Sequence, residues 1–546
     1  MKFTLKFFLY LILLCVFGML LFSFISGYEG CMHYLINAIG EAARADKIME
    51  LVAPDKFLIL QSIGIFCIVV LASILVLFEK IWSQAAAVFI YFKRQIQLLV
   101  TDLLYTEVKW VLVIPLISSV FFAVSMPVSY DEAWTYLQFT AKSPLASLCY
   151  YPAPNNHVLH SLITNVTRYI PFFNPLLCLR ISSIAVSFFC WLICFSFIKK
   201  YYSKNSSLLI VGIASMLFMS VYYSYMSRGY GLVLLFFIVS LYAAYNIIFN
   251  ADQTRHWLIF SISNVLGFFT MPSFLYVFII LNLVILLNNG LRIKKQFFSN
   301  AAVLAVVFVL YLPIIIINGI GALTNNQFVK PIARTEVLEK LPDFFSRMIS
   351  EITGVHYLVI LLFILISILM LIKNKMKFEL ILLVVFLLAP AILLIGHAVI
   401  PFPRTFNYYA FVFVFAMVIP FGSVLGKKSV GYILLITLCI QSACFFNFYY
   451  SIEKYEGFNI SYHEINKKIT GRGSYFFTTV LFETNFLFEN KTQGYEAEKL
   501  EFHFPQINVD ADTLKGFDYY IVDKQYDFTK IKKPAYSDSR TNVYVK

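Results

Sequence analysis

The chain has 546 residues, of which 60% are hydrophobic and only 13% are charged. Soluble globular proteins carry about 25% charged residues, so this composition excludes soluble, fibrous and disordered proteins and indicates a chain embedded largely in lipid. The formal net charge of +13 is also found in nucleic-acid-binding proteins, so its meaning depends on where the charges lie.

Uncharged segments long enough to cross a hydrocarbon core of ~30 Å recur along the chain, and we predict about thirteen membrane-spanning helices. The segment 257–291 is too long for one span and contains Met271 and Pro272, where we expect two short helices to meet at a turn. The predicted spans are 7–25, 57–78, 110–128, 181–198, 206–226, 229–249, the two halves of 257–291, 297–320, 356–372, 380–401, 405–425 and 430–450.

The basic residues predict the orientation, because Lys and Arg accumulate on the cytoplasmic side of membrane proteins. With the N-terminus inside, the cytoplasmic segments hold 18 basic and 5 acidic residues, whereas the charges of the outer loops and of the tail nearly cancel. We therefore predict a multi-pass protein of the inner (plasma) membrane with a cytoplasmic N-terminus and an extracytoplasmic C-terminus. The excess charge reports orientation, and nucleic acid is not an expected partner.

Residues 451–546 differ from the rest of the chain in composition. They contain no cysteine and many charges, and short apolar runs such as 475–482 and 519–522 lie between turn-rich stretches. This pattern predicts a small mixed α/β domain. The expected fold class is thus an all-α polytopic membrane protein with a small C-terminal α/β domain outside the membrane.

A large outer loop over 129–180 opens with two adjacent carboxylates, Asp131 and Glu132, at the exit of a predicted span. Charged groups at the edge of the hydrocarbon are costly to desolvate and often mark a polar cavity. Alternatively, Asp131 or Ser129 caps a short helix that starts at Glu132. Position alone leaves both interpretations open.

This pair, followed by the aromatic, Pro, Asn and His residues of 150–160, resembles the membrane-embedded GT-C type glycosyltransferases, which include protein O-mannosyltransferases and the transferase that adds aminoarabinose to lipid A. Residues 225–231 resemble the family's Ala-Arg-x-Tyr segment, and 403–407 resemble its late Pro-Arg-Tyr-like start of a helix. The resemblance runs from about 110 to 409. It implies a GT-C-like core over 109–450 and additional N-terminal helices over 1–108.

The resemblance implies a glycosyltransferase that moves a sugar, with inversion, from a polyprenyl-phosphate donor to an extracytoplasmic acceptor such as a protein, lipid A or another glycan. Asp131 would act as the general base, and Glu132 would orient the acceptor or share that role. Arg228, Arg404 and Tyr230 would bind the donor phosphate. The segment 154–157 departs from the family pattern, so the donor sugar is not identified.

The remaining polar residues of the loop have less specific patterns. The sugar pocket is expected to be lined by Asn155, Asn156, His157 and Tyr151. Alternatively, the two asparagines and His157 only cap and orient a loop helix. Arg180 is expected to extend toward the lipid headgroups.

No cofactor is required by this scheme. His157 and His160 lack a third ligand with metal-site spacing, so a divalent metal is not indicated. The main alternative is a polytopic lipid or glycan transporter or flippase, in which ionisable residues would gather near the bilayer midplane.

Overall fold

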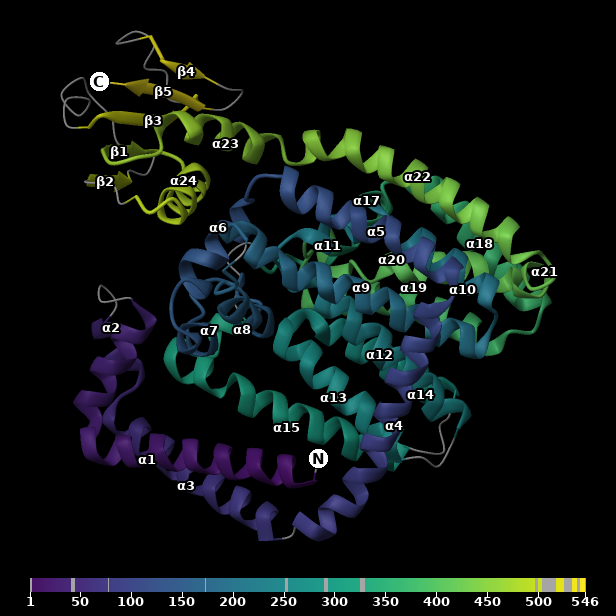
Figure 1. The fold of residues 1–546 in the computed structure, drawn as a ribbon, viewed down its shortest axis with the longest axis horizontal. Helices are drawn as coiled ribbons and strands as arrows, with labels where there is room; N and C mark the ends of the chain where they lie inside the picture. The colour runs from purple at the N-terminus through teal and green to yellow at the C-terminus, as the bar shows by residue number, and fades with distance from the viewer. Residues whose placement is uncertain are drawn as a thin grey trace.

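The computed structural model describes residues 2–40, 45–76, 78–171, 173–250, 254–288, 293–324, 329–495, 499–502, 517–524, 533–537 and 541–545. These residues form a mostly helical bundle with a small mixed sheet at the C-terminal end, and the two N-terminal helices lie along the opposite edge (Figure 1). The expected combination of a helical core and a small C-terminal α/β domain is confirmed at this level.

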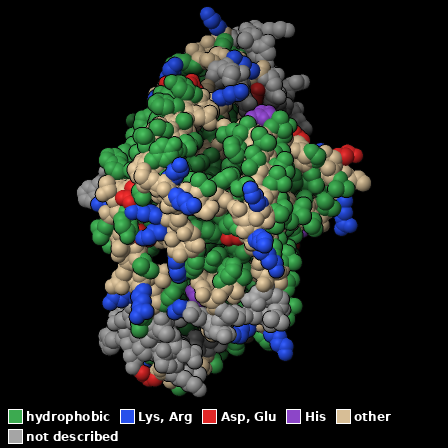
Figure 2. Space-filling view, turned by 90° about the vertical axis from the view of Figure 1, so that its right-hand side faces the viewer, with side chains coloured by type: hydrophobic (Ala, Val, Ile, Leu, Met, Phe, Trp, Pro, Cys, Tyr) green, Lys and Arg blue, Asp and Glu red, His purple; other side chains and the backbone are tan. Residues whose placement is uncertain are grey.

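Among the described residues, 8 helices are long and apolar enough to cross a membrane, or up to 10 if each of two bent helix pairs counts as one span. Hydrophobic side chains cover much of the face in Figure 2, which looks onto the side where α10, α14 and α21 lie in Figure 1. The bundle helices are α5 (Thr106–Ser125), α9 (Pro175–Tyr201), α10 (Lys204–Ala214), α11 (Phe218–Tyr225), α12 (Tyr230–Phe249), α13 (Thr254–Thr270), α14 (Leu275–Asn288), α15 (Ile293–Asn318), α17 (Arg334–Thr353), α18 (Tyr357–Lys373), α19 (Lys377–His397), α20 (Tyr409–Val418) and α22 (Val430–Tyr455).

The predicted break at Met271 and Pro272 is confirmed, because α13 ends at Thr270 and a single turn, η3 (Pro272–Phe274), leads into α14. The segment predicted as one continuous span over 206–226 is bent, since α10 and α11 meet at an angle of 72°. A second pair, α17 and α18, is bent by 92°. The predicted total of thirteen exceeds the observed number partly because it includes short apolar helices such as Tyr409–Leu425.

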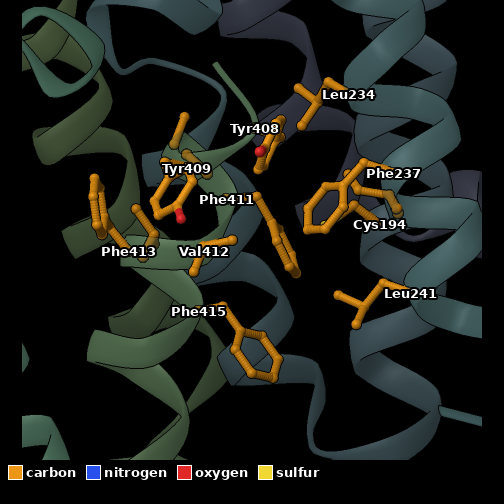
Figure 3. Packing of buried hydrophobic residues seen from close by; sticks show 14 of the residues in the cluster. Cys194, Leu234, Phe237, Leu241, Tyr408, Tyr409, Phe411, Val412, Phe413 and Phe415 are labelled. Atoms are coloured by element: carbon orange, nitrogen blue, oxygen red, sulfur yellow. The ribbon is translucent and has the colours of Figure 1, made fainter. Parts of the chain in front are cut away.

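Interlocking aromatic side chains form the centre of the bundle. Phe237 of α12 contacts Phe411 and Tyr408, with ring centroids 5.9 and 5.2 Å apart, at the start of α20, and Figure 3 shows these rings interleaved between the two helices. All three side chains are buried. Aromatic pairs of this kind contribute about 0.5–1.5 kcal/mol beyond the area that they bury, so this core holds the start of α20 against α12. The turn before α20, η5 (Pro403–Phe406), packs on α17.

The N-terminal helices pack against the segment that follows α5. α1 (Lys2–Ile39) and α3 (Pro54–Val76) lie side by side, and they are joined by α2 (Ala45–Leu51). Met32, Ile36 and Ile39 of α1 share an apolar cluster with Phe139 and Tyr150. The amphipathic α4 (Phe78–Leu104) then leads back to the bundle. The additional helices therefore support the loop.

Four short helices fold the loop over one end of the bundle, which we call the loop end. They are α6 (Tyr130–Thr135), the π-helical turn η2 (Tyr136–Thr140), α7 (Pro144–Cys149) and α8 (Val158–Thr167). Shorter helical elements occur elsewhere in the bundle, namely α16 (Gly321–Thr324), η6 (Ile419–Phe421) and α21 (Gly422–Leu425).

The C-terminal domain continues from α22 through α23 (Gly457–Ile469). Its sheet has the order β2-β1-β3-β5-β4, in which β1 pairs in parallel with β2 and β3 while β5 pairs antiparallel with β3 and β4. The strands are β1 (Ser474–Phe477), β2 (Lys499–Phe502), β3 (Tyr519–Asp523), β4 (Tyr536–Ser537) and β5 (Thr541–Val545), and α24 (Val480–Thr492) follows β1. α24 packs on α6 and η2, and Phe488 meets Tyr136, the first residue of η2, edge to face at 5.0 Å. The domain is thereby fastened to the loop end.

Candidate functional site

The helix α6 begins with a capping box that uses one of the two predicted carboxylates. The Ser129 hydroxyl accepts a hydrogen bond from the Glu132 backbone N–H, and Glu132 Oε2 accepts one from the Ser129 N–H at 3.1 Å. This reciprocal arrangement satisfies two free donors at the start of a helix. The helix-cap interpretation is thus confirmed for Ser129, but the helix begins at Tyr130 and not at Glu132.

Glu132 also forms a fully buried ion pair with Arg180 of α9. Arg180 Nε and Nη2 donate to the two carboxylate oxygens at 2.9 and 2.6 Å, and both side chains are 0% exposed. The remaining guanidinium hydrogens bind the carbonyl oxygens of Ala123, Met126 and Pro127. The prediction that Arg180 extends toward the headgroups is therefore wrong, because a buried carboxylate and three carbonyls draw it inward.

Asp131, the neighbouring carboxylate, lies in a different environment. Its side chain is 24% exposed, and Oδ2 lies 3.2 Å from Nη1 of Arg404, which is 32% exposed. Arg404 is held in the turn η5, after Pro403, and lies over the ring of Phe402 at 4.7 Å. Two residues that are 273 positions apart in sequence thus form a partly open ion pair at the loop end.

Arg228 is buried beside this pair, and uncharged groups surround it. Nη1 donates to Thr135 Oγ1 at 2.7 Å and to the carbonyls of Asn155 and Asp131 at 3.1 and 3.3 Å, and Nη2 donates to Asn155 Oδ1. Within the described part of the chain Arg228 has no carboxylate partner, and its Nε is buried without a hydrogen-bond acceptor. Its positive charge is therefore not neutralised by an ion pair.

His157 ties the loop to the start of α12. It occupies the position before α8, yet its side chain does not cap that helix. Instead Nδ1 accepts a hydrogen bond from the Gly229 N–H at 2.8 Å, and the ring meets Tyr230 edge to face at 5.1 Å. Burial, followed by the charge of Arg228, lowers the pKa of His157 well below its ordinary value. The ring is therefore neutral at physiological pH.

Asn156 and Tyr151 face the interior of the loop. The Asn156 amide donates to the carbonyls of Ser147 and Tyr150 and accepts from the Ser161 hydroxyl, so its polar atoms are already bonded. Tyr151 is 5% exposed and belongs to an apolar cluster with Val158. Asn156 and Tyr151 therefore stabilise the loop through internal contacts. Asn155 instead accepts hydrogen bonds from Arg228.

Several residues that the sequence did not single out complete the surroundings of Asp131. Thr135 lies one turn after Asp131 along α6. Its i, i+4 spacing from Asp131 was the sequence pattern that could have indicated that the two residues are neighbours. The C-terminal domain adds Asn459, whose Oδ1 accepts from the Tyr130 N–H at 3.3 Å. Glu483 of α24 lies near Tyr130, and burial raises the pKa of Glu483 to about 7. No sequence pattern could place these last two residues beside α6.

In the described part of the chain, no group of three or more His, Cys, Asp or Glu side chains has an arrangement that could hold a metal ion. His160 Nε2 lies 3.3 Å from the Ser183 hydroxyl of α9. The loop end thus combines one partly exposed carboxylate, two arginines and a neutral imidazole. Such a set can accept a proton and bind an anion.

No model of a known protein family matches the sequence, and no curated protein matches it. The functional assignment therefore depends on the site.

Proposed function

We propose that the protein is an inverting glycosyltransferase that moves a sugar from a polyprenyl-phosphate donor to an extracytoplasmic acceptor. The main support is the position of Asp131, a partly exposed carboxylate paired with Arg404 beside the buried and unneutralised Arg228. A base and two cations within one small region match what this reaction requires.

In the proposed reaction the acceptor oxygen forms a bond to the anomeric carbon as its proton passes to the Asp131 carboxylate. The bond from that carbon to the phosphate oxygen breaks, and the polyprenyl phosphate leaves with the electron pair. Arg404 is the candidate to bind the phosphate, since its guanidinium is partly exposed and carries one ion pair. Arg228 adds positive potential and holds the loop.

The two adjacent carboxylates have different roles in this proposal. Asp131 can meet an acceptor because its side chain is partly exposed, whereas Glu132 is enclosed by Arg180, Ser129 and Ser227. Glu132 is therefore a positioning residue that sets the start of α6. With the N-terminus in the cytoplasm, as the basic residues predict, the loop end faces the outside of the cell membrane. The C-terminal domain, which packs on α6, then helps to define the space for the acceptor.

The test is transfer in vitro from labelled polyprenyl-phosphate sugars to a panel of protein and glycolipid acceptors. Asp131→Asn should lower turnover by about 10²–10⁴-fold, the usual contribution of a general base. Asp343→Asn is the matched control, because Asp343 also pairs with an arginine but is 67% exposed on α17. Its turnover should equal that of the wild type.

Unchanged turnover of Asp131→Asn would exclude Asp131 as the base. If the wild type transfers no sugar from any donor, glycosyl transfer itself is wrong. Movement of a labelled glycolipid across vesicles without new bond formation would instead support a flippase.

A further inference from the structure

A cavity of ≈ 450 Å³ lies between α4, α9, α12 and α13. Its apolar lining includes Phe92, Leu99, Ile193, Val239 and Ile259. The volume falls within the range of about 300–1,000 Å³ that is typical of small-molecule sites. The cavity is independent of the residues assigned to sugar transfer.

The cavity lies far from Asp131. Lys200, which lines it, is near the last residue of α9, whereas Arg180 beside α6 is near the first turns of that helix. Twenty residues of α-helix at 1.5 Å each span about 30 Å, which is the thickness of a hydrocarbon core. The end of the cavity at Lys200 therefore lies about one hydrocarbon thickness from the loop end.

Cationic groups surround one end of this apolar space. The Asp102 carboxylate forms an ion pair with Lys199 and accepts a hydrogen bond from the Ser196 hydroxyl. Lys200 Nζ donates to Tyr242 Oη at 3.2 Å and, among the described residues, has no carboxylate within ion-pair distance.

Arg255 lies over the ring of Tyr91, another lining residue, at 4.6 Å. Its Nε is buried and lacks a hydrogen-bond partner in the described part of the chain. Among the described residues, Lys200 and Arg255 are thus two cations near the cavity without a carboxylate partner.

The helix α4, which forms one wall, has the pattern of a helix that lies in the interface. Lys93 and Arg94 are exposed in its middle, while Ile96 and Leu98 are also exposed, with 59% and 50% of their surface accessible. An amphipathic helix with basic residues on its polar face lies along a membrane surface rather than across it. The cavity is thus placed where lipid headgroups and the start of acyl chains meet.

We propose that the cavity binds an anionic phospholipid, with one acyl chain among the apolar residues and the phosphate at Lys200 and Arg255. Basic pockets between membrane helices are known to bind anionic headgroups. The apolar lining suits the acyl chain of such a lipid, and Lys200 and Arg255 suit its phosphate. A neutral lipid would offer these two cations no counter-ion beyond what the described residues supply.

The proposal is tested by native mass spectrometry of the full-length protein titrated with phosphatidylglycerol or phosphatidylcholine. Lys200→Gln should weaken phosphatidylglycerol binding about fivefold and leave phosphatidylcholine binding unchanged, while Lys200→Arg should retain the preference. Leu99→Trp, which fills the cavity, should lower the binding of both lipids. Lys294→Gln removes an exposed charge of α15 that does not line the cavity, and should behave as the wild type.

Two results would overturn the proposal. One is a wild-type protein that binds the two lipids equally. The other is an equal loss in Lys200→Gln and Lys294→Gln, which would indicate general surface attraction.

Discussion

Glu132→Gln should destabilise the protein far more than the same change at Asp131. The two Glu132 oxygens accept four hydrogen bonds, of which two come from Arg180, one from the Ser129 N–H and one from the Ser227 N–H. An amide places an NH₂ group where one oxygen stood, so two of these donors would face another donor. The Arg180 charge would remain buried without its carboxylate.

The expected cost is about 3–5 kcal/mol, as for other buried ion pairs that lose one partner. Native proteins are stable by only about 5–15 kcal/mol, so this is a large fraction of the total. Asp131→Asn should cost about 0–1 kcal/mol, because both members of its ion pair with Arg404 are partly exposed.

The assay is thermal unfolding of the purified protein in one detergent at one scan rate, followed by tryptophan fluorescence. The double variant Glu132→Leu with Arg180→Met removes both charges, but it leaves two backbone N–H groups and three carbonyls without side-chain partners, so it should recover only part of the loss. An unfolding midpoint of Glu132→Gln equal to that of the wild type would refute this reasoning.

Two further predictions concern the contacts of the loop. Phe488→Ala should free the C-terminal domain from α6, because Phe488 is buried against Tyr136 and such truncations cost about 3–5 kcal/mol. Limited proteolysis should release the domain faster, whereas the exposed Tyr495→Ala should be cleaved like the wild type, and equal rates in both would contradict the docking. Burial lowers the pKa of His160 to about 3 and lowers that of His157 as well, whereas the unfolded chain binds these protons below about pH 6.5. Stability should therefore be full above pH 6.5 and fall below it by up to about 1.4 kcal/mol per pH unit for each histidine. His160→Asn should make the fall between pH 6.5 and 5 less steep, and an unchanged slope would exclude this cause.

Local chemistry explains which elements the sequence could predict. Proline lacks the N–H that continues a helix, and the break before Pro272 was accordingly predictable. The alternating apolar runs around 475 and 519 likewise became β1 and β3. The bend between α10 and α11 has no such signal, since 215–217 contain neither proline nor glycine. Hydropathy is insensitive to this bend because lipid and protein interior are equally apolar.

The site was harder to predict because its pairs join distant segments. Asp131 was identified from its position at the end of a span, and Arg404 from a family-like segment, but their contact arises only where the folded bundle brings α6 and η5 together. The partnership of Glu132 with Arg180 was missed because a lone arginine at a helix end has the same pattern whether it turns outward or inward. The Glu132 carboxylate and the carbonyls of Ala123, Met126 and Pro127, which have no helical partner at the end of α5, turn Arg180 inward.

The contact between α1 and the loop has a consequence for biogenesis. The Ser143 hydroxyl donates to the Ala38 carbonyl at 2.8 Å, and Phe139 and Tyr150 lie in the same apolar cluster as Ile36. The ribosome makes α1 and α3 before it makes this loop, so the surface on which the loop settles is synthesised first. A shortened chain that begins at residue 106 would leave Phe139 and Tyr150 without that surface. Such a chain should be degraded in the cell, and co-expression of residues 1–105 as a separate fragment should restore its abundance.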